Sequence, residues 1–382
     1  MISNRPPTAV LEAALEDLTQ QHQRRVLKPR SPGSYPAEGF NSNDYLNLSR
    51  HPALALAAQQ AVADYGVGAT GSRLLCGDSQ LQHDVEAQLA KLKGSETALI
   101  FNTGYLANAG ILAALLDRRL WPRGVQVFAD RLIHASMYQG LRSAGVRCTR
   151  FAHNDLSHLK ELLQRSGDTD FRLILTESVF SMDGDLAPLS ELQKLAKEYD
   201  AWLYVDEAHA TGVFGSHGQG LAATEENTLI MGTCSKALGS FGGFLCCSAV
   251  FKDYLINKAP SLIYATALPP AVLGSIQAAL SLLPSLDKER EYLLSNAAIF
   301  RKYCLSLGFD TGESHSQIVP LILGKAEDAL SLSSALEELG VNVGAIRPPT
   351  VPPSGSRLRF TFTSAQREEH IEQLCHAIAR VS

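Results

Sequence analysis

The chain has 382 residues, a formal net charge of −5 and 45% hydrophobic residues, which is the composition of an ordinary soluble globular protein. This length exceeds what one hydrophobic core usually supports, so we expect two domains. The negative balance and the lack of a basic stripe argue against nucleic-acid binding. No apolar run approaches the ~20 residues of a membrane span, and no export signal is visible. The seven cysteines show no zinc-type spacing, so we expect a cytoplasmic protein without a metal.

Predicted helices and short buried strands alternate along most of the chain. Residues 8–23 place Leu11, Leu15 and Leu18 on one face, as in an amphipathic helix, and a turn-rich entry segment follows. The predicted strands cover residues 98–101, 125–129, 146–151, 173–176, 202–205, 228–231 and 244–247. Such alternation is typical of a mostly parallel sheet with helices on both faces.

The pattern changes after residue 270. One long helical stretch over 271–306 leads to a smaller α+β unit with strands near 318–323 and 358–362. We therefore predict an N-terminal helix and entry segment over 1–45, a large α/β domain over 46–272 and a small α+β domain over 273–382.

Two polar residues follow predicted strands at what we expect to be the same sheet edge. Asp206 comes directly after the apolar run 202–205, and Lys236 follows the apolar run 229–231. Open α/β sheets bind ligands at the carboxyl ends of their strands. Pyridoxal phosphate (PLP) requires a lysine that forms a Schiff base and a carboxylate that keeps the ring nitrogen protonated. Taken alone, a surface position explains Lys236 equally well, and capping of a helix explains Asp206 equally well. The two residues together favour a PLP site.

Other motifs fit the same cofactor. Thr103 and Gly104 open a helix after a strand, and a helix N-terminus suits a phosphate, although a plain tight turn explains them equally well. His134 follows another strand and either stacks on the ring or caps a helix. Ser181 and His209 are placed to hydrogen-bond the phenolic oxygen of the ring.

Some conspicuous polar residues receive no role. Arg73 lies in the glycine-rich stretch 66–77, and the pair His153-Asn154 follows the third predicted strand.

Taken together, these motifs resemble the α-oxoamine synthases, a family of fold-type I PLP enzymes, over nearly the whole chain. The stretches that carry the resemblance are residues 43–46, 104–105, 134–136, 177–184, 206–209, 233–236 and 357–359. Members condense an amino acid with an acyl thioester and release carbon dioxide and the free thiol carrier. The resemblance implies an aspartate-aminotransferase-like fold, PLP as cofactor and a homodimer with shared active sites.

The resemblance also implies which residues hold the cofactor. Lys236 forms the Schiff base and moves protons, Asp206 keeps the ring nitrogen charged, and His134 stacks on the ring. The phenolic oxygen is bound by Ser181 and His209. The residues that cover the phosphate are Thr103, Gly104, Tyr105, Thr233 and, from a second chain, Thr266.

The implied substrate residues come from both ends of the chain. Asn43 and Arg359 match residues that receive the substrate carboxylate, and Arg24 or Arg25 fills a further arginine position. Residues 345–352, which include Arg347 and Thr350, resemble the members that join L-alanine to a pimeloyl thioester in biotin synthesis. Glycine- and serine-using relatives usually carry Tyr-Pro at that place. The donor is either pimeloyl-CoA or pimeloyl-ACP.

Three alternatives stay open. The first is another α-oxoamine synthase: a glycine C-acetyltransferase, an aminolevulinate synthase or an enzyme for longer acyl chains. The second is a catalytically silent partner subunit, against which the intact Lys236, Asp206 and His134 argue. The third is a PLP-binding regulatory domain, but residues 1–40 are too few and too weakly basic to add a DNA-binding module.

Overall fold

The computed structural model describes residues 6–29 and 39–381, which form two compact units. The larger unit comprises residues 43–181 and 185–293. The smaller unit comprises residues 182–184, residues 294–381 and the described residues before 43. The structure thus groups residues 273–293 with the α/β unit and the N-terminal helix with the C-terminal unit, whereas the sequence suggested boundaries at 45 and 272.

A seven-stranded sheet forms the centre of the larger unit, with the strand order β1-β7-β6-β5-β4-β2-β3. Its strands are β1 (Thr97–Phe101), β2 (Val125–Asp130), β3 (Cys148–Phe151), β4 (Phe171–Glu177), β5 (Trp202–Asp206), β6 (Thr228–Thr233) and β7 (Gly243–Cys247). β7 is antiparallel to both of its neighbours, β1 and β6, and every other pair of adjacent strands is parallel. The predicted mostly parallel sheet is therefore confirmed.

One strand begins later than predicted. The sequence placed its start at Val146, but β3 begins at Cys148. Gly145 ends the preceding helix in the left-handed region, and the Val146 N–H still donates to the Leu141 carbonyl of that helix. Val146 therefore belongs to the helix end.

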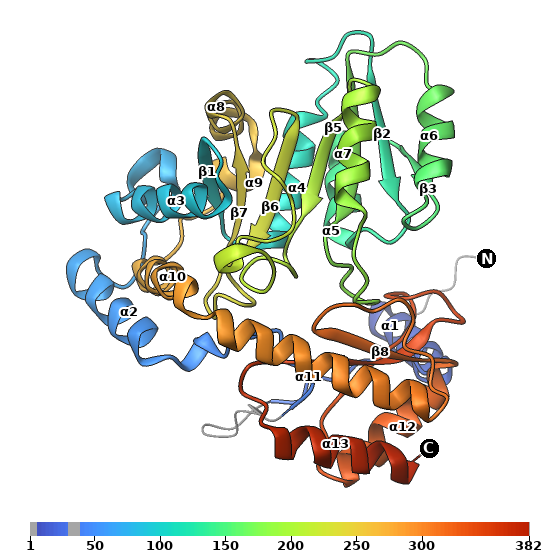
Figure 1. Ribbon diagram of the computed structural model, residues 1–382. Coiled ribbons are helices and arrows are strands. Elements are labelled where there is room, and N and C mark those ends of the chain that lie inside the picture. The colour runs from blue at the N-terminus through green and yellow to red at the C-terminus, as the bar shows by residue number, and fades with distance from the viewer. Residues whose placement is uncertain (1–5, 30–38, 382) are drawn as a thin grey trace. The chain divides into compact units, whose positions relative to one another are not determined.

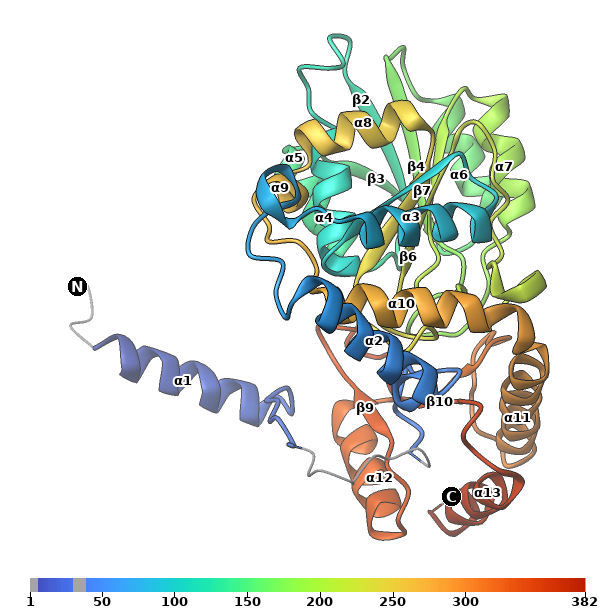
Figure 2. The same ribbon diagram turned by 90° about the vertical axis from the view of Figure 1, so that its left-hand side faces the viewer.

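Helices cover both faces of this sheet (Figures 1 and 2). They are α2 (Pro52–Tyr65), α3 (Gln80–Lys93), α4 (Gly104–Leu115), α5 (Ala135–Ala144), α6 (Leu156–Gln164), α7 (Leu189–Glu198), α8 (Ala249–Lys258), α9 (Pro260–Ile263) and α10 (Pro270–Leu282). None of the helices in the described part of the chain is both long and apolar enough to cross a membrane.

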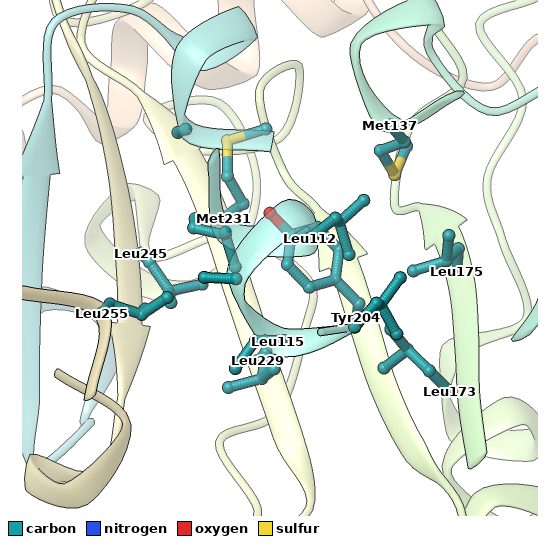
Figure 3. Packing of buried hydrophobic residues seen from close by; sticks show 14 of the residues in the cluster. Leu112, Leu115, Met137, Leu173, Leu175, Tyr204, Leu229, Met231, Leu245 and Leu255 are labelled. Atoms are coloured by element: carbon teal, nitrogen blue, oxygen red, sulfur yellow. The ribbon is translucent and has the colours of Figure 1, made fainter. Parts of the chain in front are cut away.

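The direction of each side chain along β4 and β5 follows from strand alternation. Leu175 and Tyr204 are buried with Leu112 of α4 on one face of the sheet, as Figure 3 shows. The intervening residues pack with α6 and α7 on the other face. Because successive side chains alternate between faces, Glu177 and Asp206 at the strand ends lie on the α4 side.

The long helix predicted over 271–306 is wrong. α10 ends at Leu282, a 3-10 turn covers Leu283–Ser285, and α11 (Asp287–Ser306) follows. Pro284 explains the break, since proline has no backbone N–H and its ring clashes with the preceding helical turn.

The smaller unit contains a three-stranded antiparallel sheet with the order β8-β10-β9. Its elements are α1 (Pro7–Gln20), β8 (Ile318–Gly324), α12 (Ala326–Glu338), β9 (Gly344–Ile346), β10 (Ser356–Thr361) and α13 (Glu368–Val381). The sequence analysis missed β9, which is three residues long and only half-buried. α1 ends at Gln20 and buries none of its residues.

Candidate active site

The predicted cofactor residues meet around a cavity of about 200 Å³ in the larger unit. The predicted residues that line it are Thr103, Gly104, Tyr105, His134, Asp206, His209, Thr233 and Lys236. Polar residues without a predicted role also line it, namely Asn108, Ser136, Glu177 and Ser235. Most of them lie at the carboxyl ends of strands or at the start of α4, where an open α/β sheet binds its ligand.

Asp206 lines this cavity and is held by two donors. Its Oδ1 accepts from the Ala208 N–H at 2.9 Å, and its Oδ2 accepts from Asn108 Nδ2 at 2.8 Å. The buried Tyr204 hydroxyl donates to Asn108 Oδ1 at 2.7 Å, which fixes the orientation of the amide. Sequence reasoning missed Asn108, although its position four residues after Gly104 puts both on one face of α4. Both oxygens of Asp206 are thus held by donors of the protein.

Lys236 begins a hydrogen-bonded chain along one wall. Its Nζ lies 2.7 Å from His209 Nε2, and His209 Nδ1 lies 2.5 Å from the Tyr45 hydroxyl. Tyr45 donates to Asn43 Oδ1 at 3.2 Å. All three contacts are satisfied when Lys236 donates to His209 Nε2, His209 donates from Nδ1 to the Tyr45 hydroxyl, and Tyr45 donates to Asn43. The chain links the predicted Schiff-base lysine to a predicted substrate residue.

His134 both caps α5 and lines the cavity. Its Nδ1 accepts from the Ser136 N–H at 3.2 Å and lies 2.6 Å from Ser136 Oγ. Desolvation lowers the pKa of His134, the charge of Asp206 opposes this shift, and the charge of Lys236 adds to it. The imidazole is therefore neutral near pH 7, and its predicted stacking on the ring stays a prediction.

The cavity lining also includes hydroxyl groups and the start of α4. Thr103 caps α4 by accepting from the Leu106 N–H at 3.0 Å. A Cβ at Gly104 would lie 3.7 Å from Thr233 Oγ1, and a Cβ at Gly243 would lie 2.6 Å from the Gly104 nitrogen. The first distance is an ordinary contact, whereas the second is too short for a side chain, so it is Gly243 that lets β7 approach the start of α4 closely. Hydroxyls and a helix N-terminus form a donor set that fits the PLP phosphate.

Two predicted cofactor residues do not line this cavity. Ser181 donates its N–H to Glu177 Oε2 at 3.2 Å. Thr266 is exposed, pairs with Ser72, and accepts from Asn102 Nδ2 at 2.9 Å. Their predicted contacts with the phenolic oxygen and with the partner's phosphate stay predictions.

The smaller unit contains most of the predicted substrate residues. Arg25 donates to Thr350 Oγ1 at 3.3 Å, and Arg347 donates to the carbonyl of His22. Arg359 is buried on β10 and donates to Thr361 Oγ1 at 2.8 Å. The substrate roles of these arginines, Thr350 and Arg24 stay predictions.

Comparisons with known proteins agree with this geometry. The model of the family described as aminotransferase class I and II matches residues 36–378. An 8-amino-7-oxononanoate synthase from Gluconacetobacter diazotrophicus is 47% identical, and the match covers 96% of this chain and 95% of the relative.

Two solved structures have the same fold. A serine palmitoyltransferase from S. paucimobilis with a bound PLP–myriocin aldimine superposes with a TM-score of 0.89 at 28% identity, over 98% of both chains. An 8-amino-7-oxononanoate synthase from Francisella tularensis superposes with a TM-score of 0.76 at 29% identity, over 90% of this chain and 97% of that one.

The chain belongs to the class I and II aminotransferase family and has the predicted fold-type I architecture. Within this family it is a PLP-dependent C-acyltransferase, similar over nearly its whole length to proteins named 8-amino-7-oxononanoate synthase. PLP is its cofactor, and it supplies a ring that accepts electron density from the substrate Cα. Among the residues that the structure describes, no group of His, Cys, Asp and Glu could hold a metal ion.

Proposed function

We propose that the enzyme condenses L-alanine with a pimeloyl thioester and releases 8-amino-7-oxononanoate, carbon dioxide and the free thiol carrier. This reaction belongs to biotin synthesis, and we expect it to take place in the cytoplasm. The proposal rests on the pocket that is lined by Lys236, Asp206, His134 and His209, the last of which is hydrogen-bonded to Lys236. The relative from G. diazotrophicus supports the choice of reaction.

Each residue of the pocket has a task in this reaction. Asp206 holds the proton on the ring nitrogen, and the neutral His134 provides a flat surface for the ring. Lys236 takes the Cα proton of alanine and later returns a proton, with His209 Nε2 at 2.7 Å as the neighbouring acceptor. A positioned acid–base group of this kind contributes about 10²–10⁴-fold to a rate.

The carboxylate of alanine needs a fixed partner so that decarboxylation waits for the condensation. We assign this role to Arg359, whose guanidinium binds carboxylates in a bidentate geometry, together with Asn43. Arg347, Thr350 and either Arg24 or Arg25 are assigned to the substrates. The segment 345–352 supports a pimeloyl donor, carried by CoA or ACP, over the other members of the α-oxoamine synthases.

We also propose that the active enzyme is a homodimer. The exposed segment around Ser72 pairs with Thr266, and the Ala267 N–H donates to the Gly71 carbonyl. This paired region carries Leu75 and Tyr264, which are 84% and 86% exposed. Large apolar side chains this exposed are typical of a protein–protein interface. A second copy on this surface would bring Thr266 to the partner's phosphate.

The experiment that tests the reaction measures thiol release by the purified, PLP-loaded protein. L-alanine, glycine and L-serine are each combined with pimeloyl-, acetyl-, succinyl- and palmitoyl-CoA. We expect turnover with L-alanine and pimeloyl-CoA, or with pimeloyl-ACP when CoA donors are inactive. Turnover with another pair would keep the C-acyltransferase but contradict the proposed substrates, and inactivity with every donor would support a silent subunit.

A further inference from the structure

Glu177 lines the cofactor cavity but has no task in the proposed reaction. It ends β4 directly opposite Asp206, which ends β5. Because the two strands are parallel and in register, both side chains leave the same face of the sheet at the same edge. Glu177 and Asp206 are 2% and 4% exposed. Two carboxyl groups that line the pocket are therefore buried side by side.

The hydrogen-bond donors around this pair are unequally shared. Both oxygens of Asp206 accept a hydrogen bond, from the Ala208 N–H and from Asn108. Glu177 Oε2 accepts from the Ser181 N–H, whereas Glu177 Oε1 is buried and has no hydrogen-bond partner among the residues that the structure describes. A donor stabilises the ionised form of a carboxyl, and a buried oxygen without a donor disfavours it. Glu177 therefore has fewer donors than Asp206 to stabilise a negative charge.

The charges that face Glu177 act mostly in the same direction. Burial and the negative charge of Asp206 raise the pKa of Glu177 well above its ordinary value, and Asp130 at the end of β2 adds to this. The positive charge of Lys236 and the Ser181 N–H lower the pKa; their effects are smaller than those of burial and Asp206 but larger than that of Asp130.

We propose that Glu177 is a positioning residue that works as a neutral carboxylic acid and leaves Asp206 as the only anion of the pair. An ionised Glu177 would put a second negative charge near Lys236 and would raise the proton affinity of a nitrogen that has to exchange protons in the reaction. A neutral Glu177 avoids this while its Oε2 still holds the Ser181 backbone. The inference rests on the PLP chemistry proposed for Lys236, but it does not depend on which amino acid and thioester react.

Infrared spectroscopy of the PLP-loaded enzyme tests the protonation state directly. A protonated carboxyl has a C=O stretch that is separate from the carboxylate and amide bands. We expect this band near neutral pH in the parent enzyme and its loss in Glu177→Gln. The matched control is Glu207→Gln, because Glu207 is equally buried but is ion-paired with Lys93 and accepts from the Leu221 and Ala222 N–H groups. That control should keep the band.

A second readout follows the proton affinity at Lys236. The absorbance of the PLP–lysine Schiff base is titrated with pH, and glutamine imitates a neutral acid in shape and charge. We expect the midpoint of Glu177→Gln to lie within ~0.3 units of the parent, a change of at most about twofold in proton affinity. Identical infrared spectra of parent and variant, or a midpoint shifted by more than ~1 unit, would overturn the inference.

If Glu177→Gln does not fold, the pH dependence of the band in the parent enzyme decides. Its persistence up to about pH 8 supports a neutral Glu177, and its absence at about pH 6 contradicts it. Failure of the thiol-release assay leaves both spectroscopic outcomes intact, so the two proposals fail separately.

Discussion

The amine of Lys236 lies 2.7 Å from His209 Nε2, and the sequence offers no second lysine among the residues that line this pocket. We predict that Lys236→Ala lowers thiol release by at least about 10⁴-fold, because it removes both the Schiff base and the proton acceptor. The variant should also lose the absorbance of the PLP–lysine Schiff base. Lys160→Ala, which removes an exposed lysine paired with Glu198, should keep both signals. Near-normal turnover of Lys236→Ala would contradict the assignment of the active site.

Asn108 joins Tyr204, Ser136 and Asp206 in one buried network. We predict that Asn108→Ala lowers the free energy of unfolding by about 1–3 kcal/mol, because it leaves the buried Tyr204 hydroxyl without an acceptor. PLP should also bind more weakly, since Asp206 loses a donor. Urea denaturation and PLP titration measure the two effects.

A double variant checks this account of Asn108. Tyr204→Phe removes the hydroxyl that Asn108→Ala leaves without an acceptor. Tyr204→Phe should therefore lower the free energy of unfolding by less in the Asn108→Ala variant than in the parent protein. Asn257→Ala, which removes an exposed amide that donates to the Asp253 carbonyl on α8, is the matched control and should change stability by less than about 0.5 kcal/mol. Additive effects of the two buried substitutions would contradict the network.

His153 connects the end of β2 with the segment that follows β4. Its Nδ1 lies 3.0 Å from Asp130 Oδ1 and its Nε2 lies 2.7 Å from Asp185 Oδ2. Burial alone would lower the pKa of His153, but the hydrogen bonds with Asp130 and Asp185 outweigh it and raise the pKa to about 10. The imidazolium is thus charged throughout the physiological range. Asn154 contacts the same carboxylates, since its N–H donates to Asp130 Oδ2 and its Nδ2 donates to Asp185 Oδ2, so the pair His153-Asn154 has a structural role that the sequence did not reveal.

The raised pKa predicts how stability depends on pH. In the unfolded chain His153 titrates near ~6.5, so its contribution is complete below that pH and is lost as the pH rises through about 10. We expect His153→Gln to lower the free energy of unfolding by about 2–3 kcal/mol near neutral pH and by much less above pH about 10. Urea denaturation at several pH values measures the difference between variant and parent.

The exposed pair of His83 with Asp78 provides the control for His153. His83→Gln should change stability by less than about 0.5 kcal/mol, because exposed ion pairs contribute little. If the loss of unfolding free energy in His153→Gln stays constant from pH about 6 to about 10, His153 is not a charged partner of Asp130 and Asp185.

Elements of the larger unit were predictable where one local signal determines them. Buried strands such as β5 appear as short apolar runs, and Asp206 and Lys236 could be found because they follow such runs. Glu177 also follows such a run and Asn108 lies one helical turn after Gly104, but their roles could not be assigned, because these depend on a strand register and a helix face that meet only in the folded sheet. The break at Pro284 was missed because the apolar periodicity continues on both sides of it.

On the scale of the whole chain, the smaller unit joins segments from both ends of the sequence. Phe40 packs edge-on against Phe362 at 5.6 Å between ring centroids, and Arg25 reaches Thr350. No local sequence pattern predicts such contacts, because the partners are more than 300 residues apart. The family resemblance, unlike composition and periodicity, relates residues from both ends of the chain, and so it could assign Arg24 or Arg25 and Arg359 to one site, an assignment that stays a prediction.

The proposed homodimer leads to the last prediction. Leu75→Glu puts a charge on the exposed apolar surface beside Thr266, and burying that charge in an interface is unfavourable. We expect the dimer dissociation constant to rise by about 100-fold, which corresponds to about 2.7 kcal/mol, and thiol release to fall in proportion to the dimer. Sedimentation velocity over a range of concentrations measures the first effect.

Val250→Glu is the matched control, because Val250 is 78% exposed and Leu75 is 84% exposed. Val250 follows β7, which is antiparallel to β6, so it lies at the sheet edge opposite the carboxyl ends that carry the pocket. Equal dissociation of both variants would mean that charge alone weakens the dimer, and a Leu75→Glu variant that stays dimeric and active would place the interface elsewhere. Dissociation of Leu75→Glu alone, with loss of activity, fits a pocket that is completed by Thr266 of a second copy.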